Sequence, residues 1–239
     1  MRTAIIAILS LVGLLGSALI IAKPWVTIRH AKPIIVKGYA EKLVHADAGS
    51  LTASVTATGP TNAEAYEKAG EKLQKVIGVT HINLVNQVEI VELQTSVREV
   101  LKTNEKGQKI NVIDYYAATR KVRINTVDVE ALQKLGRALY DLNSEGIRIT
   151  LSGPDFFVSD LDPIKLDLVK SATTNGKHRA KLMAQSSGET LGALTSAQQG
   201  VIQITKKNSS ATSSYGIYDT ETIEKVVKMV VTLEYEIGG

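Results

Sequence analysis

Residues 162–192, DPIKLDLVKSATTNGKHRAKLMAQSSGETLG, combine a long helical pattern with a small side chain at every fourth position from residue 172. Positions four apart stack on one face of a helix. The pattern therefore predicts a long helix that packs closely against a sheet or another helix. Its small-residue ridge comprises Ala172, Gly176, Ala180, Ala184, Gly188 and Gly192.

The ends of this helix carry recognisable signals. Asp162 suits an N-cap, Pro163 suits the first turn, and Gly188 or Gly192 suits the end. A charged stretch, 177–181 (KHRAK), is an alternative candidate for a site, but packing is the favoured role. Apolar area beside the ridge is expected from Leu166, Val169, Leu182, Met183 and Leu191.

The segments around this helix read as strands and two further helices. The capping box TNAE at 61–64 opens one helix, and Asp128 opens the other. Alternating apolar and polar residues predict strands, and the Ser/Thr-rich segment 206–220 (KKNSSATSSYGIYDT) predicts an exposed loop. The order predicts an α+β fold of mainly antiparallel sheets covered by three helices. The expected strands are 33–45, 49–58, 82–101, 110–126, 147–152, 193–207 and 224–237.

The excess of basic over acidic side chains lies entirely in residues 1–32. Of 28 basic side chains, four lie in residues 1–32, which have no acidic residue, so residues 33–239 carry 24 basic and 24 acidic side chains. A neutral globular part has no excess charge to steer it onto nucleic acid. The chain has no cysteine, which excludes disulfides and thiolate metal sites.

Residues 3–22, TAIIAILSLVGLLGSALIIA, form an uncharged apolar run of the length that spans a bilayer as a helix. Cleavage after Ala18 is the alternative, but the apolar run continues past it, which favours an uncleaved anchor. The flanking charges are nearly balanced and do not settle the orientation. The anchoring side chains are Ile5, Ile6, Leu9, Leu11, Leu14, Leu15, Leu19 and Ile20, and the bilayer is the predicted partner of 3–22.

The predicted domain organisation follows from this anchor. Residues 1–32 form a membrane anchor and linker, and 33–239 form the globular part. The globular part is either one domain or two, divided into about 33–145 and 146–239.

No constellation of residues predicts catalysis. The stretch 171–177 (SATTNGK) fails as a phosphate-binding loop, because Ser171 replaces its first glycine and His178 replaces the magnesium-binding Ser or Thr. The four histidines lie in separate segments without metal-ligand spacing; they are His30, His45, His81 and His178. We therefore expect a non-enzyme with no catalytic, cofactor-binding or metal-binding residues, and a hydrolase is disfavoured.

Four stretches together resemble the SIMPL-domain family, which includes a periplasmic immunogen of Gram-negative bacteria. The resemblance covers residues 33–237 and departs from the family at Gly176 and at Thr173-Thr174, where more alanine and charge are usual. The four stretches are IIVKGYAEKLVHADAGSLTASVTATG, TNAEAYEKAGEKLQKV, VRINTVDVEALQKLGRALYDLNSEGI and RAKLMAQSSGETLGAL.

The resemblance implies an exported envelope protein that forms large symmetric homo-oligomers and has no established enzymatic reaction. It places the globular part in the periplasm, with a single pass through the bacterial inner membrane. A ring or cage of anchored subunits is therefore the expected function. The alternatives are a ligand-binding or chaperone module that uses residues 206–220, and a channel-like assembly; the ligand is not identifiable from the sequence.

Overall fold

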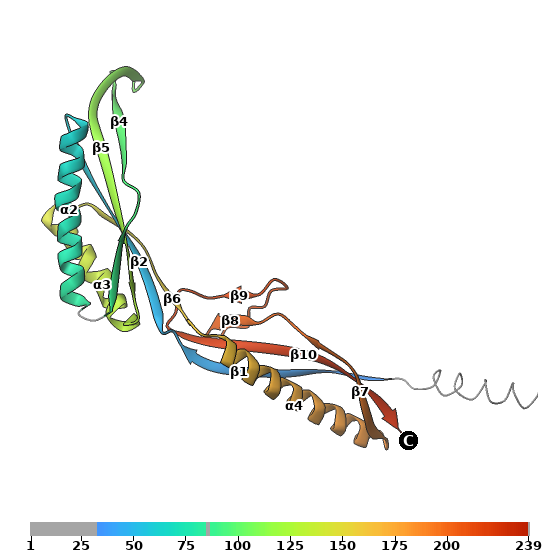
Figure 1. The fold of residues 1–239 in the computed structure, drawn as a ribbon. Helices are drawn as coiled ribbons and strands as arrows, with labels where there is room; N and C mark the ends of the chain where they lie inside the picture. The colour runs from blue at the N-terminus through green and yellow to red at the C-terminus, as the bar shows by residue number, and fades with distance from the viewer. Residues whose placement is uncertain (1–32, 85–86, 239) are drawn as a thin grey trace, which may run out of the picture. The chain divides into compact units, whose positions relative to one another are not determined.

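The structure, a computed structural model, describes residues 33–84 and 87–238 (Figure 1). Its order of strands and helices is mixed α+β, as predicted, with three α-helices in the described residues. The helices are α2 (Asn62–Asn83), α3 (Val129–Asp141), followed by a 3-10 turn (Leu142–Glu145), and α4 (Asp162–Ser186). The strands are β1 (Ile34–His45), β2 (Ala48–Gly59), β3 (Val88–Glu92), β4 (Ser96–Thr103), β5 (Lys109–Thr126), β6 (Ile149–Phe157), β7 (Thr190–Gln199), β8 (Gln203–Lys206), β9 (Ile217–Tyr218) and β10 (Glu224–Gly238).

The strands form two five-stranded sheets. One has the order β3-β5-β2-β6, with β4 also paired to β5. The other has the order β1-β10-β8-β9, with β7 also paired to β10. Strand β5 pairs antiparallel with β2, β3 and β4, and the pairs β2–β6 and β7–β10 are also antiparallel, whereas β8 and β9 are parallel.

The described residues divide into two compact units. The first consists of 33–42, 163–202 and 228–238, and the second of 43–162 and 203–227. This division does not follow the proposed cut near residue 145, because β1 and β10 each contribute residues to both units.

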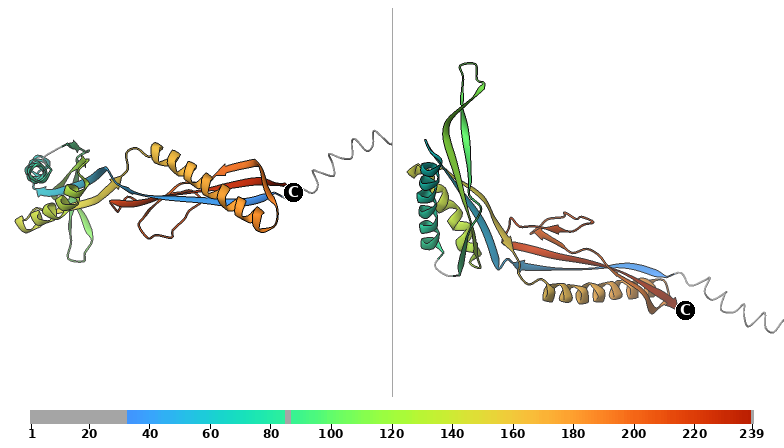
Figure 2. Two further views of the ribbon diagram at one scale, coloured as in Figure 1. Left: turned by 90° about the horizontal axis from the view of Figure 1, so that it is seen from below. Right: turned by 45° about the horizontal axis from the view of Figure 1, so that its top comes forward.

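The core of the second unit lies between the sheet β3-β5-β2-β6 and the helices α2 and α3, which cover the same face (Figures 1 and 2). Strand β2 alternates as predicted: Leu51, Ala53 and Val55 are fully buried, whereas the intervening Thr and Ser residues are partly exposed. The helix starts also follow the prediction, because Thr61 accepts from the Glu64 N–H at 3.2 Å and Asp128 accepts from the Ala131 N–H at 2.9 Å.

The predicted strand 82–101 is wrong in its first part. Helix α2 continues through Asn83, since Thr80 keeps the buried spacing of Leu73 and Val76 and its hydroxyl donates to the Val76 carbonyl oxygen at 2.8 Å. The remainder forms two strands, β3 and β4. The predicted strand 193–207 is likewise divided into β7 and β8, with Gly200 between them donating its N–H to the Val230 carbonyl oxygen at 2.9 Å.

Helix α4 is the packing helix of the first unit, and it buries Ala172, Gly176, Ala180 and Ala184. The chain approaches it closely at Gly38 of β1, where an added Cβ would overlap the carbonyl oxygen of Ala172. Small side chains therefore allow backbone-to-backbone contact between the helix and β1.

The predicted ridge is too long at its end, because the helix stops at Ser186. Gly188 follows it with a φ of +80°, and Gly192 lies in β7. The predicted apolar flank is also wrong for Leu166, Leu182 and Met183, which are exposed. The buried line instead continues back to Leu168, because the helix packs along its row of i+4 positions.

The predicted membrane anchor and its eight apolar side chains lie outside the described residues. Within residues 33–84 and 87–238, none of the helices is both long and apolar enough to cross a bilayer.

Candidate functional site

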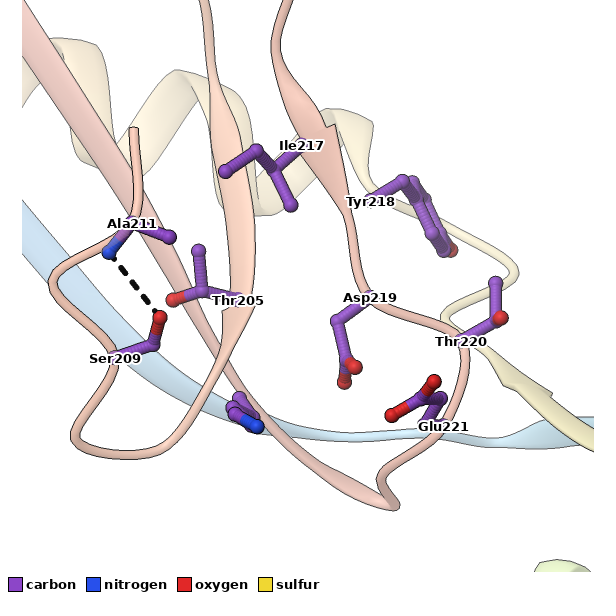
Figure 3. A pocket seen from close by; sticks show the side chains of 9 residues that line it. Thr205, Ser209, Ala211, Ile217, Tyr218, Asp219, Thr220 and Glu221 are labelled. Atoms are coloured by element: carbon purple, nitrogen blue, oxygen red, sulfur yellow. Dashed lines mark hydrogen bonds between the residues drawn. The ribbon is translucent and has the colours of Figure 1, made fainter. Parts of the chain in front are cut away.

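A cavity of about 300 Å³ lies in the second unit, between strands β8 and β9 and the loops that flank them (Figure 3). Seven of its nine lining residues belong to the segment 206–220, which the sequence predicted as an exposed loop and as the binding segment of the ligand-binding alternative. Its lining consists of Thr205, Lys206, Ser209, Ala211, Ile217, Tyr218, Asp219, Thr220 and Glu221.

Gln203 fixes the loop that forms one wall of the cavity. Its side-chain amide donates to the Ser213 carbonyl oxygen at 2.7 Å, and its amide oxygen accepts from the Ser213 N–H at 3.3 Å. The Gln203 side chain thus bonds to both backbone polar groups of Ser213, as the backbone of a neighbouring strand would. On the other side, the Asp219 N–H donates to the Ile204 carbonyl oxygen at 2.9 Å. These hydrogen bonds fix the loop at Ser213 and the segment at Asp219 against β8.

Thr205 supplies an unsatisfied polar group to this cavity. The residue is 2% exposed, and its hydroxyl oxygen has no hydrogen-bond partner in the described part of the chain. A buried hydroxyl without a partner costs about 1–3 kcal/mol, because its water has been removed without replacement. A hydroxyl both donates and accepts, so a polar ligand group in the cavity can satisfy it.

Asp219 and Glu221 bring carboxylates to the opposite side of the cavity (Figure 3). Burial acts to raise the pKa of Asp219, but hydrogen bonds from Thr222 and Lys225 outweigh it, so the pKa lies below its usual value. The Lys225 ammonium is fully buried and lies 3.2 Å from the Asp219 carboxylate. Asp219 is therefore ionised and paired, whereas Glu221 is exposed to solvent.

This arrangement can bind a small polar molecule by hydrogen bonds. None of the nine lining residues is a histidine or a cysteine. No group of three or more metal-ligating side chains occurs in residues 33–84 and 87–238.

The site residues proposed from the sequence do not meet at this cavity. The ridge of α4 belongs to the first unit. Arg179, from the charged stretch 177–181, donates to the Lys37 carbonyl oxygen at 2.8 Å. His45 lies 3.5 Å from Glu224, whereas His81 and His178 are exposed on α2 and α4; His30 lies outside the described residues.

Sequence reasoning missed Lys225 and Thr205. Lys225 had a detectable signal, because it occupies the same alternating face of β10 as the buried Val227 and Met229. A lysine in that register must find partners away from water. Thr205 had no such signal, since its burial depends on how β9 and the loop close over β8.

A second feature of the same unit is the projecting end of the β4–β5 hairpin, residues 101–115 (Figure 1). The predicted turn at 104–107 is confirmed: Asn104 accepts from the N–H groups of Lys106 and Gln108 at 3.0 and 2.9 Å, and Gly107 has a φ of +77°. We call residues 101–115 the arm. It exposes the large apolar side chains of Ile110, Val112, Ile113 and Tyr115.

No functionally curated protein matches the chain. One solved structure, of a proposed amidohydrolase/peptidase from Burkholderia cenocepacia, has 14% sequence identity and a TM-score of 0.27. The match covers 59% of this chain and 34% of that chain, and at this TM-score it supports no shared activity. The model of the SIMPL family, described as a protein of unknown function (DUF541), matches residues 34–235. Since that match spans nearly all of the described residues, the chain belongs to the SIMPL family.

Proposed function

We propose that this SIMPL protein is a non-enzymatic, membrane-anchored cell-envelope protein that self-assembles into a large symmetric homo-oligomer on the periplasmic side of the membrane. The apolar run 3–22 supports the anchor, and the neutral charge of residues 33–239 fits a surface that meets copies of itself. The proposed assembly rests on the exposed apolar side chains of the arm.

The arm is built as a ribbon of two strands that extends past the N-terminal start of α2 (Figures 1 and 2). An isolated two-stranded ribbon is only marginally stable in water, because it has no third strand or helix to cover its faces. Val112 is 50% exposed, and Ile110, Ile113 and Tyr115 are each more than a third exposed. Packing against another subunit would remove this apolar area from water and order the ribbon.

The test is the particle mass of the full-length protein in mild detergent, measured by sedimentation or light scattering. The wild type is expected to form one discrete large particle. The double variant I110T/V112T keeps β-branched side chains but makes both polar, so it should shift the mass toward the monomer without lowering the strand content.

The matched control is V91T, which makes the same change at an exposed position of β3 outside the arm. It is expected to leave the particle mass unchanged. A monomeric wild type, or an I110T/V112T particle of wild-type mass, would contradict assembly through the arm.

A second candidate function, binding of a small envelope ligand, is favoured by the unpartnered hydroxyl of Thr205 in its cavity. The chemistry suits a small molecule rich in hydroxyl or amine groups, which can bond to both Thr205 and Glu221. T205V has nearly the same shape without the hydroxyl, so it should abolish ligand shifts in an NMR screen of such compounds while leaving thermal stability equal or higher. Ligand shifts that persist in T205V would argue against this site.

A further inference from the structure

Another cavity of the second unit, of about 450 Å³, is lined by three basic side chains and three threonines. It lies at the sheet β3-β5-β2-β6 and is separate in its lining residues from the cavity at β8 and β9. The lining comprises Thr56, Ala57, Thr58, Lys72, Arg98, Arg148 and Thr150.

Strand register brings Arg98 and Thr58 to this cavity. Arg98 of β4 stands opposite Ala117 of β5, and Ala117 stands opposite Thr58 of β2. Residues opposite one another in a sheet point to the same face. Ala117 lies between Arg98 and Thr58 in this row. Its short side chain leaves space beside the long side chain of Arg98.

Arg148 approaches from the other side of β2. Strand β6 begins at Ile149, which pairs with Val55, and Thr150 pairs with Ser54. Arg148 immediately precedes β6 and lines the cavity together with Thr150 and Thr56. Thr56 is itself positioned by a 3.0 Å hydrogen bond between its hydroxyl and that of Thr119.

Lys72 reaches the cavity from helix α2. Its ammonium donates to the Thr56 carbonyl oxygen at 3.3 Å, which places the charge at the edge of β2. Beyond Val55 the pairing with β6 has ended, so this part of the edge is open to a lysine from the helix.

The three charges have no acidic partners. Within residues 33–84 and 87–238, Lys72, Arg98 and Arg148 form no ion pair. Two acidic side chains of the same unit pair with other cations: Glu92 with Arg120 at 2.8 Å and Glu145 with Lys75 at 3.8 Å. The cavity is therefore a local concentration of positive charge in an otherwise neutral domain.

We propose that this cavity binds a small soluble molecule that carries a phosphate group. The guanidinium groups of Arg98 and Arg148 present paired N–H donors that match a tetrahedral oxyanion, and Lys72 adds a third charge. The hydroxyls of Thr58 and Thr150 supply further donors. A phosphate carries close to two charges at neutral pH, so three cations favour it over a monocarboxylate.

The experiment measures binding of inorganic phosphate to the full-length protein in detergent by titration calorimetry, with acetate at equal ionic strength as the comparison anion. Phosphate is expected to bind measurably more tightly than acetate. The double variant R98Q/R148Q should weaken phosphate binding by about a hundredfold, because it removes two charged hydrogen bonds and each is worth about tenfold.

The matched control is K121Q/R123Q, which removes two positive charges from exposed positions of β5 that do not line the cavity. This control should keep phosphate affinity within about twofold. Phosphate should also raise the unfolding midpoint of the wild type and of the control more than that of R98Q/R148Q, since a ligand stabilises the state that binds it.

Three results would overturn the proposal. One is the absence of phosphate binding by the wild type, and another is an equal affinity for phosphate and acetate. The third is an equal loss of affinity in R98Q/R148Q and in K121Q/R123Q, which would show that general surface charge attracts the anion. None of these results depends on whether the protein assembles through the arm.

Discussion

Lys225 is an ammonium group buried in the inward-facing register of β10. It is held by the Asp219 carboxylate and by the backbone carbonyl oxygens of Asp219, at 2.6 Å, and of Thr222. These three acceptors replace the water that the ammonium loses on folding. The pair ties β10 to the segment that forms the acidic side of the cavity in Figure 3.

Removing the negative charge of Asp219 should therefore destabilise the protein. D219N leaves the buried lysine without its counter-charge and is expected to lower the free energy of unfolding at neutral pH by about 3 kcal/mol. Because folding lowers the pKa of Asp219, the wild type keeps this stabilisation above the usual carboxyl pKa and loses it as the pH falls through the lowered value. Urea unfolding across acidic and neutral pH should show a flatter profile for D219N.

The control for this pair is D167N on α4. Asp167 pairs with Lys42 at 2.8 Å, but both side chains are about half exposed, so water already stabilises each charge. D167N should leave the stability nearly unchanged. Equal losses in D219N and D167N would contradict the role assigned to burial.

At the scale of elements, the contact between α4 and β1 depends on glycine at two facing positions. An added Cβ at Gly38 would overlap the Ala172 carbonyl oxygen, and one at Gly176 would lie 2.7 Å from the Leu233 side chain. Two hydrogen bonds flank the contact: the Tyr39 N–H donates to the Asn175 side chain at 3.1 Å, and Arg179 donates to the Lys37 carbonyl oxygen. The small side chains therefore permit a polar as well as an apolar contact.

The same substitution should have opposite effects at two glycines. G38A is expected to destabilise the protein by about 1–3 kcal/mol or more, because the obstacle is backbone that cannot move aside. G78A, at an exposed position in the C-terminal third of α2 where nothing beyond the adjoining helix backbone lies within 4 Å of the added Cβ, should stabilise it by about 0.5–1 kcal/mol. Thermal unfolding of both variants checks the pair, and a G38A protein as stable as the wild type would refute the close contact.

At the scale of the whole molecule, neither compact unit is a continuous piece of chain. Each contains residues from both β1 and β10, which are far apart in sequence. A cut near residue 145 would separate β6 from β2, its partner from Ala48 to Val55. Neither compact unit can therefore be separated from the other by a single cut in the chain.

A shortened chain that begins at Ala31 tests whether the described residues assemble by themselves. If the arm makes the contacts between subunits, this chain should form particles of the same subunit number without detergent. A monomeric shortened chain beside a large full-length particle would assign assembly to residues 3–22 and contradict the role of the arm. The measurement is sedimentation velocity at micromolar concentration.

Local pattern was sufficient for much of the fold. Alternation identified β2 and β10, the capping residues Thr61 and Asp128 identified two helix starts, and the spacing of small residues identified the packing face of α4. These signals succeed because they depend on periodicity and on hydrogen bonds within a few residues.

By itself, the sequence determined the α+β class, the three helices, the family resemblance, and the neutrality of residues 33–239. Only the tertiary structure decided where α2 ends, which side chains flank the ridge of α4, and which residues line the two cavities. Arg98 lies in β4, Lys72 in α2 and Arg148 just before β6, and Thr205 loses its water only when β9 and its loop close over β8. Such groups are brought together by strand register and by contacts between segments far apart in the chain. Neither of these can be read from the local order of residues.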